Sequence, residues 1–177
     1  MGDYLPSSTV LPIGESRQRL AAQNTGGEMH DQRFFAAYTE ERVSASRRTL
    51  RPLAVVAIRV VPERSDPLHH HALGADPVVN LLVSTIRDSD TSAHADDGTL
   101  LVLLEDTDEN GALAMLSRVR DQYLSQLPDH LMWAGMSVYP INSFNAAELI
   151  DLAREALADA LVWPQGRIEA SSAQSDR

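Results

Sequence analysis

The sequence contains no cysteine and no lysine. Without cysteine the chain cannot form disulfides or thiolate metal sites, which fits a reducing compartment, and we expect a cytoplasmic protein. All fifteen basic residues are arginine, so phosphate contacts from lysine are not possible. No apolar run approaches the roughly 18 residues that span a membrane. The N-terminus also lacks a basic-then-apolar signal pattern, so we expect no membrane insertion.

Positive charge is scarce as well. The 15 basic residues face 25 acidic ones, for a net charge of −10, and no basic run is present. Nucleic acids are held mainly by neutralised phosphates, so we expect no nucleic-acid partner. The 177 residues, 44% of them hydrophobic, fit a single domain of ordinary size.

Composition divides the chain into three parts. Residues 1–28 combine proline, serine and glycine with scattered apolar positions, which predicts a flexible leader. Residues 29–168 carry the regular patterns of a folded domain. Residues 169–177 are small and polar, which predicts a loose C-terminal tail.

Helix and strand patterns alternate within the domain. Apolar periodicity and capping residues predict helices at 29–48, 76–87, 109–123 and 145–157. Strands are predicted at 53–61, just before Asp97-Gly98, at 100–104, at 131–138, and as a short edge strand within 163–168. This order indicates an α/β (α+β) fold of the ferredoxin-like type, with an antiparallel central sheet and helices packed on one face.

A hairpin and an Arg-x-x-Asp element stand close together in the middle of the chain. Asp97-Gly98 predicts a two-residue turn, in which both central residues need positive φ. The strand after it is continuously apolar and therefore central. Five residues before the hairpin, the Arg-x-x-Asp element ends at Asp90, having begun at Arg87.

These features, in this order over residues 29–168, resemble the GGDEF (diguanylate cyclase) family. Where that family has Gly-Gly-Asp-Glu-Phe, this chain has Asp96, Asp97, Gly98, Thr99 and Leu100. Five further patches resemble family patterns, at 74–76, 103–108, 136–138, 147–157 and 166–168. The resemblance implies a GGDEF-type fold, with a central antiparallel sheet flanked by helices.

The residues that the resemblance assigns to catalysis are missing. In the family, GTP condensation needs two metal-holding carboxylates, one on the first strand and one in the signature. Here the first strand has Ala57 and Arg59 at those positions, and Thr99 replaces the signature glutamate. Asp96 and Asp97 replace the two glycines and would repel a polyphosphate. The resemblance therefore predicts a degenerate domain with no catalytic residues, no metal and no enzyme activity.

The Arg-x-x-Asp element is retained. In the family it belongs to the product-binding inhibitory site, which holds cyclic di-GMP with the help of an arginine from elsewhere. An arginine fork can hold guanine or a phosphate, and an aspartate can accept from the guanine N1 and N2 donors. We therefore expect Arg87 and Asp90 to bind cyclic di-GMP, with no other cofactor.

The alternative is a ligand-free scaffold. In that hypothesis Arg87 and Asp90 only form an ion pair at a surface helix end, and the fold serves for homodimerisation or for docking a partner protein. Other features have simpler structural interpretations. His69-His70-His71 predicts an exposed loop rather than a metal site, Asp76 predicts a helix cap, and the two tryptophans predict core and edge packing.

Overall fold

The computed structural model describes residues 29–67 and 77–171. The leader, the three consecutive histidines, Asp76 and the last six residues lie outside the described residues, so the predictions made for them remain predictions. Within the described part, no helix is both long and apolar enough to cross a membrane.

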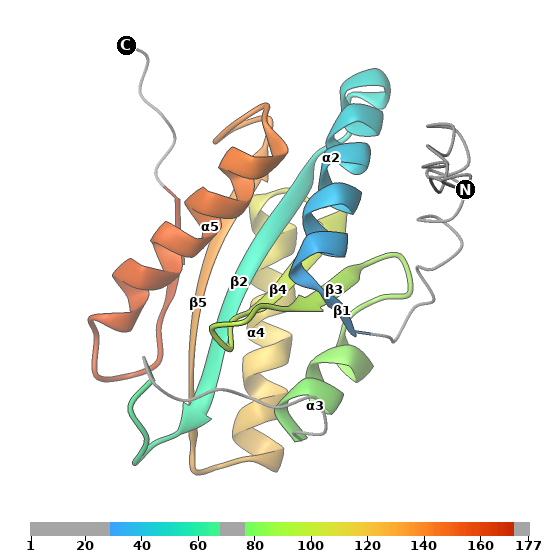
Figure 1. Cartoon of the computed structure of the whole chain (residues 1–177). Helices are drawn as coiled ribbons and strands as arrows, with labels where there is room; N and C mark the ends of the chain where they lie inside the picture. Colours follow the sequence, from blue (N-terminus) through green and yellow to red (C-terminus); the bar gives the residue numbers. More distant parts are fainter. Residues whose placement is uncertain (1–28, 68–76, 172–177) are drawn as a thin grey trace, which may run out of the picture.

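Six strands form one mixed sheet in the order β1-β3-β4-β2-β5-β6 (Figure 1). The three central strands are antiparallel, as predicted: β4 (Leu100–Glu105), β2 (Leu53–Pro62) and β5 (His130–Tyr139). β3 (Thr91–His94) pairs antiparallel with β4. The two edge strands, β1 (Met29–Asp31) and β6 (Ile168–Ala170), run parallel to their neighbours β3 and β5.

Four helices complete the described fold: α2 (Gln32–Thr49), α3 (Pro77–Thr85), α4 (Glu109–Gln126) and α5 (Ala146–Leu161). α2 starts three residues later than predicted, because Asp31 caps it by accepting a 2.8 Å hydrogen bond from the Phe34 N–H. The three residues before it pair with β3 instead. A strand of three residues is too short to show an alternating pattern, so β1 was not predicted.

The helices cover both faces of the sheet, so the prediction of helices on one face is wrong. α2 and α5 pack on one face, and α3 and α4 pack on the other (Figure 1). Along β2, Val55 and Ala57 belong to the first core, whereas Val56 and Ile58 belong to the second. A strand that is buried on both faces reads as a continuous apolar run, which is the pattern that β2 and β4 show.

α5 packs unusually close to β5 at Gly135. A Cβ added at Gly135 would lie 2.1 Å from the backbone nitrogen of Leu157 and 2.3 Å from the carbonyl oxygen of Ala153, so a side chain there requires the helix to move. Ala57 on β2 is the register partner of Gly135. The helix therefore packs against a glycine and an alanine that are register partners on neighbouring strands.

The cap of α5 confirms half of the predicted capping box. Asn145 Oδ1 accepts a hydrogen bond from the Glu148 N–H at 3.1 Å. The Glu148 carboxylate does not return to the Asn145 N–H; it accepts from the Ser143 hydroxyl at 2.5 Å. That hydroxyl in turn accepts from the Asn145 N–H at 2.9 Å, so Ser143 relays the second half of the motif.

The C-terminal end of the domain extends further than predicted. The edge strand begins at Ile168 rather than at Trp163, and Glu169 and Ala170 belong to the sheet rather than to a tail. Trp133 is a core residue, as predicted, and its indole N–H donates to the Trp163 carbonyl oxygen at 3.0 Å. Trp163 itself is about half exposed, with the Arg167 guanidinium 4.3 Å above its ring.

Candidate functional site

The hairpin between β3 and β4 lies where it was predicted, but its turn differs. The Gly98 N–H donates to the Ala95 carbonyl oxygen at 2.9 Å, so the central residues of the turn are Asp96 and Asp97. Only Gly98 has positive φ, at 80°, whereas the predicted Asp97-Gly98 turn needs it at two positions. The prediction of a two-residue turn is therefore wrong.

The Asp97 side chain explains this conformation. Its Oδ1 accepts a hydrogen bond from the Thr99 N–H at 2.9 Å, and the Ala95 N–H donates to the Thr99 carbonyl oxygen at 2.9 Å. The result is a three-residue loop with a left-handed glycine at its third position, a common hairpin type. Aspartate favours it because its carboxylate bonds the backbone two residues on.

Arg59 on β2 reaches the hairpin from the sheet. Ile58 pairs with Leu100, so Arg59 and Thr99 are the next cross-strand neighbours. The Arg59 guanidinium donates to Thr99 Oγ1 at 2.9 Å and to the Pro67 carbonyl oxygen at 3.0 Å. Arg59 is only 6% exposed. Arg59 and Thr99 stand at positions that the resemblance relates to the family's metal-holding carboxylates. Here a hydrogen bond from a guanidinium to a hydroxyl joins them instead.

Asp97 links this contact to α5. Its Oδ2 lies 3.0 Å from an Arg154 guanidinium nitrogen, and its Oδ1 lies 3.9 Å from Arg59. Arg154 follows Ala153, the residue whose carbonyl faces Gly135, so the close packing of α5 brings this arginine to the hairpin.

The charges of this cluster shift two pKa values. Burial lowers the pKa of the Arg59 guanidinium, although the Asp97 charge opposes that shift. Burial by itself raises the pKa of Asp97, but hydrogen bonds from Thr99 and the charges of Arg154 and Arg59 outweigh it, and the pKa lies below its usual value. Within the described residues, no group of three or more metal-ligating side chains is arranged to hold an ion.

Arg87 and Asp90 line a second site, a pocket of about 270 Å³. Arg118 of α4 lines the same pocket, and so do the residues just after β4. Its other walls are made by Pro52, Leu104, Asp106, Thr107, Asp108, Gly111, Ala114 and Met115. The two residues of the Arg-x-x-Asp element thus share one cavity with an additional arginine.

The Asp90 side chain is buried and turned toward the backbone of Arg87. Asp90 is 4% exposed, and its Oδ2 accepts from the Arg87 N–H at 3.0 Å. The Asp90 N–H donates to the Arg87 carbonyl oxygen at 2.9 Å. The Asp90 carboxylate therefore bonds the Arg87 backbone, and the charge of the Arg87 side chain also acts on it.

Groups of the protein itself surround the Asp90 carboxylate. Asp90 Oδ1 is buried and has no hydrogen-bond partner that meets ordinary geometry. Burial raises the pKa of Asp90, and this shift is partly offset by the Arg87 N–H, the Arg87 charge, and hydrogen bonds from the Glu105 backbone and the Ser89 side chain.

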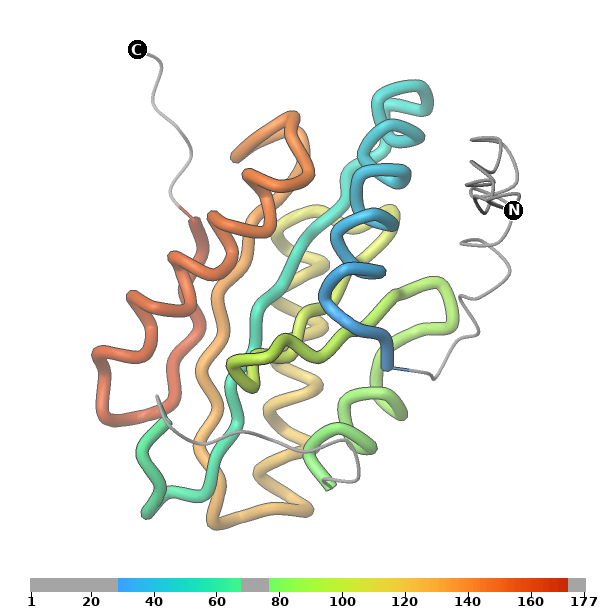
Figure 2. Tube along the Cα trace, viewed as in Figure 1, coloured from blue at the N-terminus to red at the C-terminus, as the bar shows by residue number. Residues whose placement is uncertain are grey.

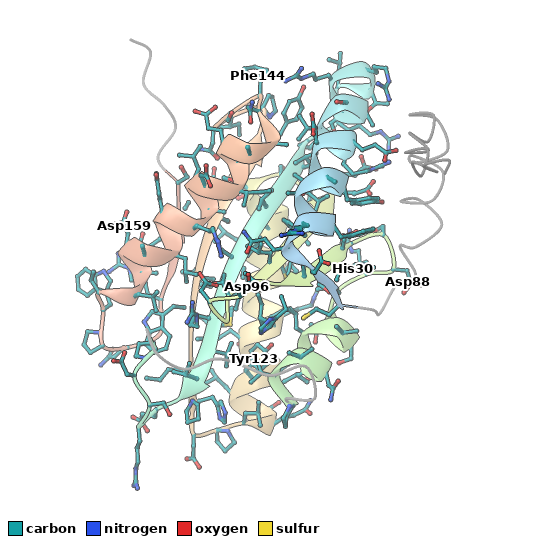
Figure 3. All side chains as sticks on the ribbon, in the orientation of Figure 1. His30, Asp88, Asp96, Tyr123, Phe144 and Asp159 are labelled. Atoms are coloured by element: carbon teal, nitrogen blue, oxygen red, sulfur yellow. The ribbon has the colours of Figure 1, made fainter. Side chains whose placement is uncertain are left out.

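The two sites lie at opposite ends of β3. The Arg87–Asp90 turn precedes this strand and the hairpin follows it. Figure 3 labels Asp88, within the turn, and Asp96, at the hairpin tip, well apart on the two sides of α2. Figure 2 shows the hairpin tip in front of β2, between α5 and α2. A ligand in the pocket therefore would not contact the hairpin tip.

Two arginines of these sites were not predicted from the sequence. Arg118 belongs to an exposed helix surface and lies 28 positions after Asp90 in the sequence, so no local motif connects them. Arg154 lies on the flank of α5 next to the buried Ala153. A charged residue beside a buried helix stripe is the only local signal, and it does not indicate a partner.

The sequence matches no protein-family model, and no curated protein matches it. Solved structures match clearly by fold. The GGDEF domain of YfiN (TpbB) from Pseudomonas aeruginosa is 18% identical, with a TM-score of 0.71 over 81% of this chain and 91% of that chain. The active GGEEF domain of a Vibrio cholerae diguanylate cyclase is 18% identical, with a TM-score of 0.69 over 84% and 100%.

A third similar structure contains a ligand. It is the coiled coil and GGDEF domain of DgcB from Caulobacter crescentus in complex with c-di-GMP, 12% identical, with a TM-score of 0.65 over 89% of this chain and 90% of that chain. At these identities the likeness establishes the fold. The described part of the chain has the α/β fold of GGDEF domains, which confirms the expected fold class.

Proposed function

We propose that this domain does not condense GTP and acts as a regulatory module that binds cyclic di-GMP. The observation that carries the proposal is the pocket that Arg87, Asp90 and Arg118 line together. The resemblance to the family's inhibitory site supports it, because that site uses the same pair and a further arginine.

The chemistry of the three side chains suits a guanine nucleotide. The Asp90 carboxylate can accept hydrogen bonds from guanine N1–H or N2–H, which adenine does not offer in that pattern. A guanidinium fork matches guanine O6 and N7, and it also matches two phosphate oxygens. Arg87 and Arg118 therefore divide between the base and the phosphodiester.

The state of the hairpin supports the absence of catalysis. The buried Arg59 guanidinium bonds Thr99 and lies near Asp97. A divalent cation in contact with these residues would face the fixed positive charge of a buried guanidinium. We therefore expect no cyclic di-GMP from GTP with magnesium or manganese. Product formed by a preparation free of other cyclases would refute this part of the proposal.

Calorimetry with the full chain tests binding. Cyclic di-GMP should bind, whereas GTP and an unrelated dinucleotide should bind much more weakly. Arg87→Ala and Arg118→Ala should each weaken binding, and each loss of a charged hydrogen bond is worth about 1.5–3 kcal/mol. Arg120→Ala is the matched control, because Arg120 lies two residues further on the same helix and outside this pocket. A flat titration at millimolar cyclic di-GMP would reject the receptor.

One observation favours the scaffold alternative. Three large apolar side chains at one end of the fold are exposed: Leu50 by 86%, Phe144 by 62% and Ile141 by 54%. The Arg47 side chain donates to the Phe144 carbonyl oxygen, so the α2 end and the loop before α5 are adjacent, and Figure 3 labels Phe144 at this end. Self-association that is independent of nucleotide and is lost in Phe144→Ser would support this second function.

A further inference from the structure

An ion pair lies at the edge of the pocket. Arg51 Nη1 is 2.5 Å from Asp106 Oδ2. Asp106 lines the pocket, and so does Pro52, the residue after Arg51. The Thr107 N–H donates to the Pro52 carbonyl oxygen at 3.2 Å, which holds the two segments together. The Arg51 guanidinium therefore contacts a residue of the pocket wall, although Arg51 itself is not a lining residue.

Asp106 occupies a backbone conformation that favours glycine. Its φ is 49°, in the left-handed region. Aspartate tolerates this region better than most residues, but glycine adopts it without strain. The ion pair itself is more than half exposed on both sides, and exposed pairs contribute little to stability. Backbone strain of this kind is concentrated at ligand sites, so stability alone does not explain the carboxylate.

The carboxylates of the pocket differ in how they are held. Asp90 is fixed by the Arg87 N–H, and Asp108 caps α4 by accepting from the Gly111 N–H at 2.8 Å. The carboxylate of Asp106 contacts a side chain, Arg51, instead of a helix end or turn. Asp106 can therefore release its partner without disturbing the backbone hydrogen bonds of either neighbour.

We propose that Asp106 is a built-in counter-ion that competes with the ligand's phosphate for Arg51. In the free protein Asp106 neutralises Arg51. When an anionic ligand enters the pocket, Arg51 exchanges the carboxylate for a phosphate oxygen and becomes the third arginine of the site, beside Arg87 and Arg118. This inference rests on the proposed binding of a phosphodiester in this pocket, and it identifies what limits the affinity.

Charge removal with preserved backbone geometry tests the exchange. Asp106→Asn keeps a residue that tolerates the left-handed region, and calorimetry with cyclic di-GMP at one fixed ionic strength should show binding three- to tenfold tighter than that of the unmodified protein. Arg51→Gln should weaken binding by a similar factor. In the Arg51→Gln background, Asp106→Asn should no longer tighten binding by more than about twofold, because the released arginine is missing.

Controls separate this mechanism from general electrostatics and from failure of the proposed function. Asp88→Asn removes one negative charge from an exposed residue that does not line the pocket, and it should change the affinity by less than twofold. If binding is lost in Arg87→Ala but Asp106→Asn does not tighten it, or tightens it equally without Arg51, the counter-ion mechanism is wrong and the receptor stands. If neither the unmodified protein nor Asp106→Asn binds, both are wrong.

Discussion

Replacement of Arg59 by methionine is the sharpest test of how the hairpin is held. Methionine keeps an unbranched apolar side chain but removes the donors to Thr99 and Pro67. Hydrogen bonds to charged groups are each worth about 1.5–3 kcal/mol, so two of them amount to about 3–6 kcal/mol. Removal of the buried guanidinium also removes its desolvation cost of several kcal/mol, which offsets part of the lost hydrogen-bond energy. The free energy of unfolding should therefore fall by about 2 kcal/mol.

Lysine at the same position separates charge from geometry. Arg59→Lys keeps the positive charge, but a single ammonium group lacks the planar fork that spans the Thr99 hydroxyl and the Pro67 carbonyl. The charge then remains buried with fewer hydrogen bonds. Arg59→Lys should therefore destabilise the domain at least as much as Arg59→Met, which is the reverse of the order expected from charge conservation.

The assay is urea denaturation followed by circular dichroism at pH 7. Arg64→Met provides the matched control, since Arg64 is an exposed arginine in the turn after β2, and it should stay within about 0.5 kcal/mol of the unmodified protein. A double-mutant cycle with Thr99→Val should give a coupling energy of about 1 kcal/mol. An Arg59→Met protein as stable as the original would refute this account of the hairpin.

Three further predictions concern stability. Burial raises the pKa of Asp90 in the folded state. Its contribution to the free energy of unfolding is therefore largest below the ordinary carboxylate pKa and is lost as pH rises through the raised folded value. Asp90→Asn should remove that part of the pH dependence, measured by urea titrations at several pH values. Leu50 has φ 56° and is exposed, so Leu50→Gly should raise the free energy of unfolding by about 0.5–1 kcal/mol and increase Tm, and a lower Tm would contradict the strain argument. Gly135→Ala should cost about 1–3 kcal/mol or more in urea denaturation, because the new Cβ meets the α5 backbone.

Most of the sheet could be predicted from the sequence, because buried strands carry a strong local signal. The runs at 53–61, 100–104 and 131–138 became β2, β4 and β5. Hairpin position followed from the Asp-Gly pair, but the turn type did not. It depends on one hydrogen bond from the Thr99 N–H to the Asp97 carboxylate, which competes with the alternative turn and leaves no mark in the residue pattern.

The candidate pocket was only half predictable. Arg87 and Asp90 form a local motif, whereas Arg118 and Asp106 reach the pocket from α4 and from the end of β4. Contacts between distant segments depend on how the layers pack, and periodicity carries no information about them. Arg59 shows the same limit of prediction from the sequence. The sequence indicated that it cannot hold a metal, but only the structure shows that it bonds the hairpin instead.

The guanidinium beside Thr99 is covalently part of the chain, and this sets how the hairpin responds to its surroundings. A site filled by a dissociable cation or nucleotide gains stability according to the ligand concentration relative to Kd. Arg59 is part of β2 and is bonded to Thr99, so its presence at the hairpin does not depend on the concentration of a cation or a nucleotide. We therefore expect the tip of this hairpin to hold one conformation across metal and GTP concentrations, and the domain's thermal stability to be the same in chelator and in excess magnesium.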